Sequence, residues 1–148
     1  MRSRLTGGLA LLAALLASGL VVASCGDDDD ALTKSEFIKQ ADAICKQGNE
    51  RIDAEAKKIF TSGKQPSQAQ LNQFATETLI PDVQRQVDDV RALDEPSEDE
   101  DQVNAFLDSA QADLDKGEED PSYLTSEKSF AKTNKLGQQY GFKVCSAD

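Results

Sequence analysis

The sequence predicts an all-α fold: an antiparallel (up-down) four-helix bundle with a proline-kinked second helix and one disulfide. Capping-box patterns occur three times along the chain, and each is followed by apolar residues spaced three or four positions apart. Segments that alternate polar and apolar residues, as half-buried strands do, are few. A chain of 148 residues, of which 39% are hydrophobic, suits one domain with a modest core.

Residues 1–24 have the pattern of a lipoprotein signal peptide. Two arginines near the start precede an uncharged, apolar run over residues 5–23. The run ends in Val22, Ala23, Ser24 and Cys25, which resembles the lipobox of bacterial lipoproteins. The resemblance implies that the Cys25 thiol receives a diacylglycerol and becomes the acylated first residue after cleavage, as in palmitate-bearing lipoproteins. The alternative is a plain secreted protein or an uncleaved N-terminal helix.

Residues 25–32 are expected to form an acidic tether between the lipid and a helical domain of residues 33–148. Asp27–Asp30 repel one another, so the segment should be extended and solvated. At about 3.4 Å per residue it holds the domain within roughly 25 Å of the membrane. A divalent cation bound by these carboxylates is the weaker alternative, because nothing fixes the oxygen ligands in a cage.

The first helix is expected over Lys34–Thr61, after the capping box Thr33–Glu36. Small residues in its apolar stripe, Gly48 among them, permit close approach of a neighbour, and Gly63 should end it. The stripe comprises Phe37, Ala41, Ile44, Cys45, Gly48, Ile52, Ala56 and Ile59.

The second helix is expected over Gln68–Leu93, after the capping box Ser67–Gln70. Pro81 interrupts it and predicts a kink near Thr78–Ile80, because proline removes a backbone hydrogen bond and clashes with the preceding turn. Two separate helices, with Pro81 starting the second, are the alternative. The apolar pattern continues in phase past the proline and favours the kink.

The third helix is expected over Glu98–Lys116, after a capping box at Ser97–Glu100, with Gly117 as its end. Pro121–Leu124 should form one separate turn. A weaker stripe over residues 130–140 predicts the fourth helix, ended by a left-handed Gly141 with Phe142 folding back on the last turn.

The three cysteines separate into one lipid site and one pair. With Cys25 lipidated, Cys45 and Cys145 are the remaining pair, and export would place them in an oxidising compartment. A disulfide between them should attach the tail to the first helix. A thiol pair for metal or redox work is the weaker alternative, since there is no C-x-x-C motif and no His in the chain.

Several segments resemble a group of small, uncharacterised secreted lipoproteins of actinobacterial type. These are Ala41–Cys45, Ile80-Pro81 with Val90–Leu93, Ala105–Leu107 and Tyr140–Cys145. The resemblance covers most of residues 25–148, and it implies a helical bundle with one disulfide. The resemblance implies no biochemical activity.

Composition and motifs argue against several functions. A net charge of −11 argues against nucleic acid as a partner, and the absence of His removes the commonest general base and metal ligand. Asp113–Glu118 looks like the start of a calcium loop, but Gly117 and Leu124 stand where oxygen ligands belong. We therefore expect no enzyme activity, no metal and no cofactor.

The sequence favours a lipid-anchored, monomeric protein on the extracytoplasmic face of the cell membrane, with a non-catalytic binding or structural role in the envelope. One alternative is a small-ligand or solute-binding module that uses space between helices near Pro81. Another is a hydrolase using paired carboxylates. The acid-rich segment of residues 88–120 is expected to be mainly a solvated surface that pairs weakly with basic neighbours. The weaker alternative is a docking face for an envelope protein or other cationic partner, or for divalent ions of the cell wall.

Overall fold

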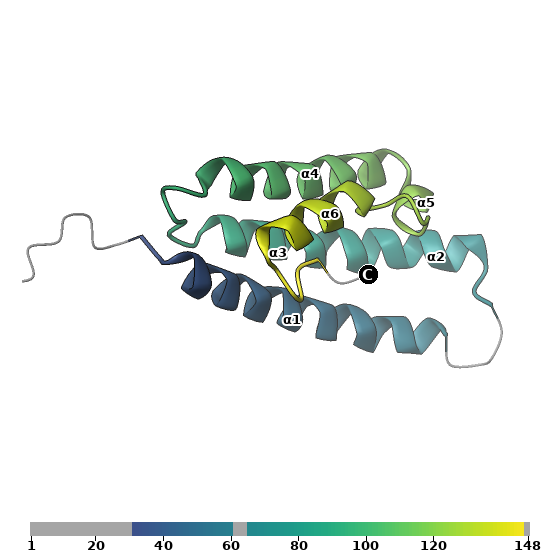
Figure 1. Ribbon diagram of the computed structural model, residues 1–148. Coiled ribbons are helices and arrows are strands. Elements are labelled where there is room, and N and C mark those ends of the chain that lie inside the picture. Colours follow the sequence, from purple (N-terminus) through teal and green to yellow (C-terminus); the bar gives the residue numbers. More distant parts are fainter. Residues whose placement is uncertain (1–30, 61–64, 147–148) are drawn as a thin grey trace, which may run out of the picture.

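The computed structural model describes residues 31–60 and 65–146, and all regular secondary structure in these stretches is helical (Figure 1). The predicted all-α fold is confirmed there, and α3 packs against both α1 and α4 while α6 packs against α4. The predicted signal peptide, Cys25 and Gly63 lie outside the described residues. The elements are α1 (Lys34–Ile59), α2 (Gln68–Phe74), a π-helical segment (Ala75–Leu79), α3 (Ile80–Arg91), α4 (Glu100–Glu119), α5 (Pro121–Leu124) and α6 (Ala131–Tyr140).

Helices α1 and α2 begin at the predicted capping boxes. The Thr33 hydroxyl accepts from the N–H of Glu36 at 3.3 Å, and the Glu36 carboxylate accepts from the N–H of Thr33 at 3.1 Å. Ser67 and Gln70 repeat the arrangement at α2. Because each box satisfies two otherwise unpaired N–H groups, both helix starts could be placed from the sequence alone.

The chain passes from α2 through the π-helical segment into α3 without leaving helical backbone geometry, and Pro81 lies in the first turn of α3, where the alternative of two helices placed it. The N–H of Ile80 donates to the carbonyl of Ala75, five residues back. Pro81 has no N–H, and its ring would collide with the carbonyl four residues earlier in a regular α-helix. The wider π turn just before it accommodates the ring.

The boundaries of α4 differ from the prediction at both ends. Ser97 makes no capping box; the N–H of Asp99 instead donates to the carbonyl of Pro96, and α4 begins at Glu100. Gly117 does not end the helix, which continues to Glu119. A Cβ at Gly117 would lie 2.3 Å from a methyl of Leu124, so this glycine is needed for the close approach of α5.

The chain closes on the core after α6. Gly141 adopts φ +116°, and the N–H groups of Gly141 and Phe142 both donate to the carbonyl of Gly137, as the sequence predicts. Phe142 is fully buried and packs 4.8 Å from the ring of Phe106 and 4.9 Å from that of Tyr140. Within the described stretches, no helix is both long and apolar enough to cross a membrane.

Candidate functional site

Of the predicted site residues, the structure describes the cysteine pair, and Cys45 and Cys145 are bonded as predicted. Val22, Ala23, Ser24 and Cys25 lie outside the described residues. The bond closes a separation of 100 residues and attaches the C-terminal segment to α1.

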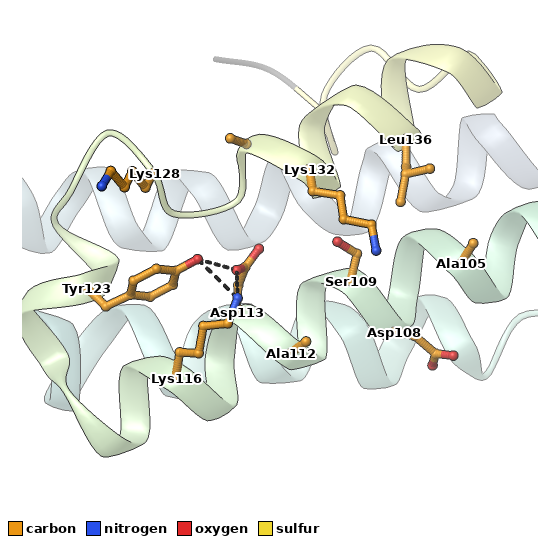
Figure 2. Close-up of a pocket in the computed structure, with 11 residues that line it drawn as sticks. Ala105, Asp108, Ser109, Ala112, Asp113, Lys116, Tyr123, Lys128, Lys132 and Leu136 are labelled. Carbon is orange, nitrogen blue, oxygen red and sulfur yellow. Dashed lines mark hydrogen bonds and ion pairs between the residues drawn. The ribbon is translucent and has the colours of Figure 1, made fainter.

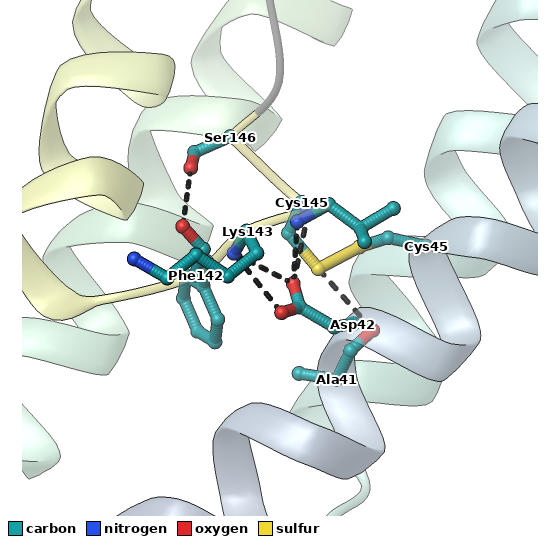
Figure 3. The surroundings of a disulfide bond; sticks show 8 residues. Ala41, Asp42, Cys45, Phe142, Lys143, Cys145 and Ser146 are labelled. Carbon is teal, nitrogen blue, oxygen red and sulfur yellow. Dashed lines mark hydrogen bonds between the residues drawn. A yellow bond between two sulfur atoms is a disulfide. The ribbon is translucent and has the colours of Figure 1, made fainter.

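A carboxylate reinforces this attachment (Figure 3). Asp42, one helical turn before Cys45, accepts hydrogen bonds from three consecutive backbone N–H groups of the tail. The distances are 3.0 Å from Lys143, 2.9 Å from Val144 and 3.1 Å from Cys145. These N–H groups have no helix or sheet to join, so the carboxylate provides the acceptor that an irregular tail needs.

An open groove of about 560 Å³ lies between α4, α5 and the start of α6 (Figure 2). Asp113, at its floor, is only 5% exposed. Its carboxylate accepts from the Tyr123 hydroxyl at 2.5 Å, from the Lys116 ammonium at 3.2 Å and from the Thr133 hydroxyl at 3.2 Å. Side chains from α4, α5 and α6 therefore meet at the Asp113 carboxylate.

The Asp113 contacts shift the pKa values of its partners. The hydrogen bond to Asp113, together with burial, raises the pKa of Tyr123 above its ordinary value of 10.0. The hydrogen bonds to Asp113 and Tyr123 raise the pKa of Lys116 above 10.5. Tyr123 is thus a neutral donor and Lys116 a cation at neutral pH, which suits them to stabilise the Asp113 carboxylate.

This arrangement is suited to holding the helices rather than to proton transfer. A general base needs a carboxylate with a free lone pair facing a substrate, whereas Asp113 is engaged on both oxygens. The groove rim carries Lys128 and Lys132, which form no ion pair among the described side chains; Lys132 extends over the groove toward Ser109. Nowhere in residues 31–60 and 65–146 do three or more His, Cys, Asp or Glu side chains come together as a metal site would require.

A second buried carboxylate joins α1 to α3. Asp82 accepts from Arg51 Nε at 2.7 Å and also from the Arg85 guanidinium. Burial alone would raise the pKa of Asp82, but the two guanidinium groups outweigh it and hold the pKa below the ordinary value of 3.8. Asp82 and Asp113 share no partner, so they are two separate structural centres.

One buried polar atom stands apart from these satisfied groups. Gln86 is 8% exposed, and its Nε2 is the one buried side-chain nitrogen or oxygen without a hydrogen-bond partner among the described residues. Leaving such a donor unpaired costs about 1–3 kcal/mol. A Cβ at Gly48 would lie 2.2 Å from this amide, so the glycine is what allows Gln86 to pack against α1.

Gln86 lines two small cavities. The inner one, of about 60 Å³, has mostly apolar walls from α3 and α4, and the outer one, of about 150 Å³, reaches Asn49 at the surface. Val83, Gln86, Phe130 and Cys145 line both. The two spaces are therefore neighbours, separated by few side chains.

Sequence reasoning found the cysteine pair but not the two carboxylate centres or Gln86. In the sequence, Asp113 belongs to a segment that only partly matches a calcium loop, and Asp42 lies in Ala41–Cys45, one of the segments that resemble the lipoprotein group. The available signal was periodicity, since Asp113 lies three residues after Ala110 and one before Leu114, on the buried face of α4. An acid in an apolar stripe predicts a paired charge. Comparison of the chain with protein-family models, with curated proteins and with solved structures finds no match.

Proposed function

We propose that this chain is a lipid-anchored protein on the extracytoplasmic face of the cell membrane, with a non-catalytic binding or structural role in the envelope. The observation that carries the proposal is the lipobox pattern at Val22–Cys25, directly after an apolar run. The resemblance to small actinobacterial-type lipoproteins agrees with it. The position at which the chain enters the helical bundle also supports the proposal of a lipid anchor.

The described chain begins at one end of the bundle, and its first residues are fixed there. The N–H of Leu32 donates to the carbonyl of Asp94 at 3.2 Å, and Lys34 pairs with Asp99 at 3.3 Å. The start of α1 is thereby joined to the connection between α3 and α4. Since α1 extends about 39 Å at 1.5 Å per residue, the far end with the exposed Phe60 would project away from the membrane.

The end nearest the tether is acidic. Burial, and to a lesser extent the nearby Glu100 carboxylate, raises the pKa of Glu95 above 4.5. Anionic lipid headgroups would repel such a surface, so the domain would stand off the membrane at the reach of its tether. The acids at this end are Asp94, Glu95, Glu98, Asp99, Glu100 and Asp101.

The buried charges support a role without catalysis. Asp82 and Asp113 each have their own basic partners, so a hydrolase with paired carboxylates finds no support in them. We also infer that the domain is a monomeric up-down four-helix bundle, in which α1, the α2–α3 helix, α4 and α6 alternate in direction and Pro81 kinks the second helix.

A fatty-acid labelling experiment tests the anchor. Cells expressing the chain are grown with an alkyne-tagged palmitate, and membrane and soluble fractions are compared for wild type, Cys25→Ala and the matched control Ser24→Gly. We expect label and membrane retention in wild type and Ser24→Gly, and loss of both in Cys25→Ala. A Cys25→Ala protein that is processed and still bound to membranes would overturn the proposal.

A second candidate function, binding of a small molecule between the helices, is favoured by one specific observation. Gln86 lies only a few residues after Pro81 and lines two small cavities, while its unpartnered amide nitrogen packs against Gly48 of α1. This is the region where the sequence predicted space between helices.

A further inference from the structure

We propose that the groove between α4, α5 and the start of α6 binds a small organic carboxylate (Figure 2). The carboxylate pairs with the Lys132 ammonium, and the apolar part of the ligand lies against the alanines of the groove. The groove shares no lining residue with the cavities beside Gln86. The inference therefore goes beyond both functions given above and is independent of the lipid anchor.

Both acidic side chains of the groove already have basic partners. The buried Asp113 accepts from the Lys116 ammonium at 3.2 Å and from two hydroxyl groups. Asp108 pairs with Arg91 of α3 at 3.3 Å. Each negative charge in the groove is thus matched by one positive charge, and neither acid is paired with the remaining lysines of the groove.

Lys132 supplies the unpaired positive charge. Its side chain extends across the groove toward Ser109, and its ammonium forms no hydrogen bond or ion pair with any residue that the structure describes (Figure 2). An ammonium carries three donors, and all three are available to a ligand here. Lys128, at the Tyr123 end of the groove, has no ion pair with a described side chain either. The groove therefore has a positive charge, although the whole chain carries −11.

The start of α6 adds to this positive charge. The helix begins at Ala131, which lines the groove, and no described side chain caps its N-terminus. The first N–H groups of a helix carry a partial positive charge that falls off within one turn. The helix end supports the site that Lys132 forms and is not a site by itself.

The walls near Lys132 are apolar. Ala105 and Ala112 are exposed on α4, two helical turns apart, and Leu136 is half-buried on α6. The two alanines leave the groove open, and all three side chains present hydrocarbon to its contents. An inorganic anion would leave this surface uncovered, whereas the hydrocarbon chain of a carboxylate would remove it from water.

Volume and net charge limit the ligand further. A space of about 560 Å³ is within the usual range for small-molecule sites. Polyanions are disfavoured, because the chain as a whole is strongly acidic and repels them. A carboxylate carries one charge at neutral pH, whereas a phosphate monoester carries almost two. The groove thus suits a small monoanion with an apolar body.

The experiment compares a carboxylate with its neutral amide. Purified full-length chain is titrated with hexanoate and separately with hexanamide at constant ionic strength. The two probes have nearly equal shape and differ in charge. Binding is followed through the backbone amide resonances of Ala112 and Lys132. We expect hexanoate to shift both resonances and to bind about two- to fivefold more tightly than hexanamide, as one partly exposed ion pair gives.

Two charge variants locate the effect. Lys132→Gln should abolish the preference for hexanoate. The matched control Lys135→Gln removes the same charge from the same helix outside the groove, and should retain the preference. Ala112→Leu fills the groove and should weaken both probes. All three side chains are exposed, so an unchanged melting temperature is expected for each variant.

Three results would overturn the proposal: equal affinities for hexanoate and hexanamide, equal losses in Lys132→Gln and Lys135→Gln, or inorganic phosphate bound as tightly as hexanoate. The second would show that only the net charge of the protein matters, and the third that the apolar walls contribute nothing. Each result would leave the palmitate labelling of Cys25 unaffected. Failure of this site is therefore distinguishable from failure of the anchor.

Discussion

The carboxylate of Asp42 accepts a hydrogen bond from the backbone N–H of Cys145 at 3.1 Å. Asp42 lies one helical turn before Cys45, the residue to which Cys145 is disulfide-bonded. Covalent and hydrogen-bonded attachments thus hold the same tail segment to the same face of α1. The tail in turn places Phe142 in the core. The disulfide and Asp42 act together to complete the fold.

Asp42→Ala should lower the free energy of unfolding by about 2–3 kcal/mol, because three N–H groups lose a charged acceptor. Urea denaturation of the oxidised protein measures it. Asp53→Ala is the matched control, an exposed aspartate on the same helix, and should change stability by less than about 0.5 kcal/mol. Equal effects of the two substitutions would contradict the role assigned to Asp42.

Reducing the Cys45–Cys145 bond should lower the melting temperature substantially. The chain-entropy model gives about 4.7 kcal/mol for a loop of 100 residues, as an upper-end value. Thermal unfolding with and without reductant measures the effect, and a Cys45→Ala/Cys145→Ala variant should be insensitive to reductant. A wild-type melting temperature unchanged by complete reduction would show that the tail is held without the bond.

Asp82 should make stability fall at acidic pH. Its pKa is below the ordinary 3.8 in the folded state, so its contribution is complete above the unfolded pKa and is lost as pH falls through the lower folded pKa. We expect wild type to lose more stability than Asp82→Asn between pH 5 and about 2, measured by urea denaturation at several pH values. Parallel pH profiles for the two proteins would count against the pairing with Arg51 and Arg85.

Gly117→Ala should destabilise the protein although alanine favours helix. The new Cβ would lie 2.3 and 2.4 Å from atoms of Leu124, and overpacking of this kind costs about 1–3 kcal/mol. Denaturation of Gly117→Ala, Leu124→Ala and the double variant forms a cycle that isolates the clash. The double variant should be more stable than the sum of the single effects; simple additivity would place the cause elsewhere.

The sequence predicted the elements that local chemistry determines. Capping boxes at Thr33 and Ser67 placed two helix starts, and Gly141 placed the end of the last helix, because their hydrogen bonds are formed within a few residues. The predictions that Gly117 ends a helix and that Ser97 starts a capping box were wrong. Gly117 has a role in packing against Leu124, and Asp99 has partners in α1 and α6, so both depend on tertiary contacts.

The candidate sites were less predictable for the same reason. The disulfide followed from counting cysteines. Lys116 is a local i,i+3 partner of Asp113 within α4, but the approach of Tyr123 and Thr133 to Asp113 depends on how α5 and α6 fold over α4, which no local pattern specifies. The unpartnered Gln86 amide likewise results from its position against Gly48, 38 residues earlier in the chain.

The intact mass of the protein extracted from membranes, measured before and after reduction, tests the central claim most directly. We predict a chain that begins at Cys25, carries a diacylglyceryl group, and gains the mass of two hydrogens on reduction as the Cys45–Cys145 bond opens. A chain that retains residues 1–24, or that begins elsewhere without lipid, would contradict the proposal of a disulfide-bonded helical bundle that is anchored through a lipid on Cys25.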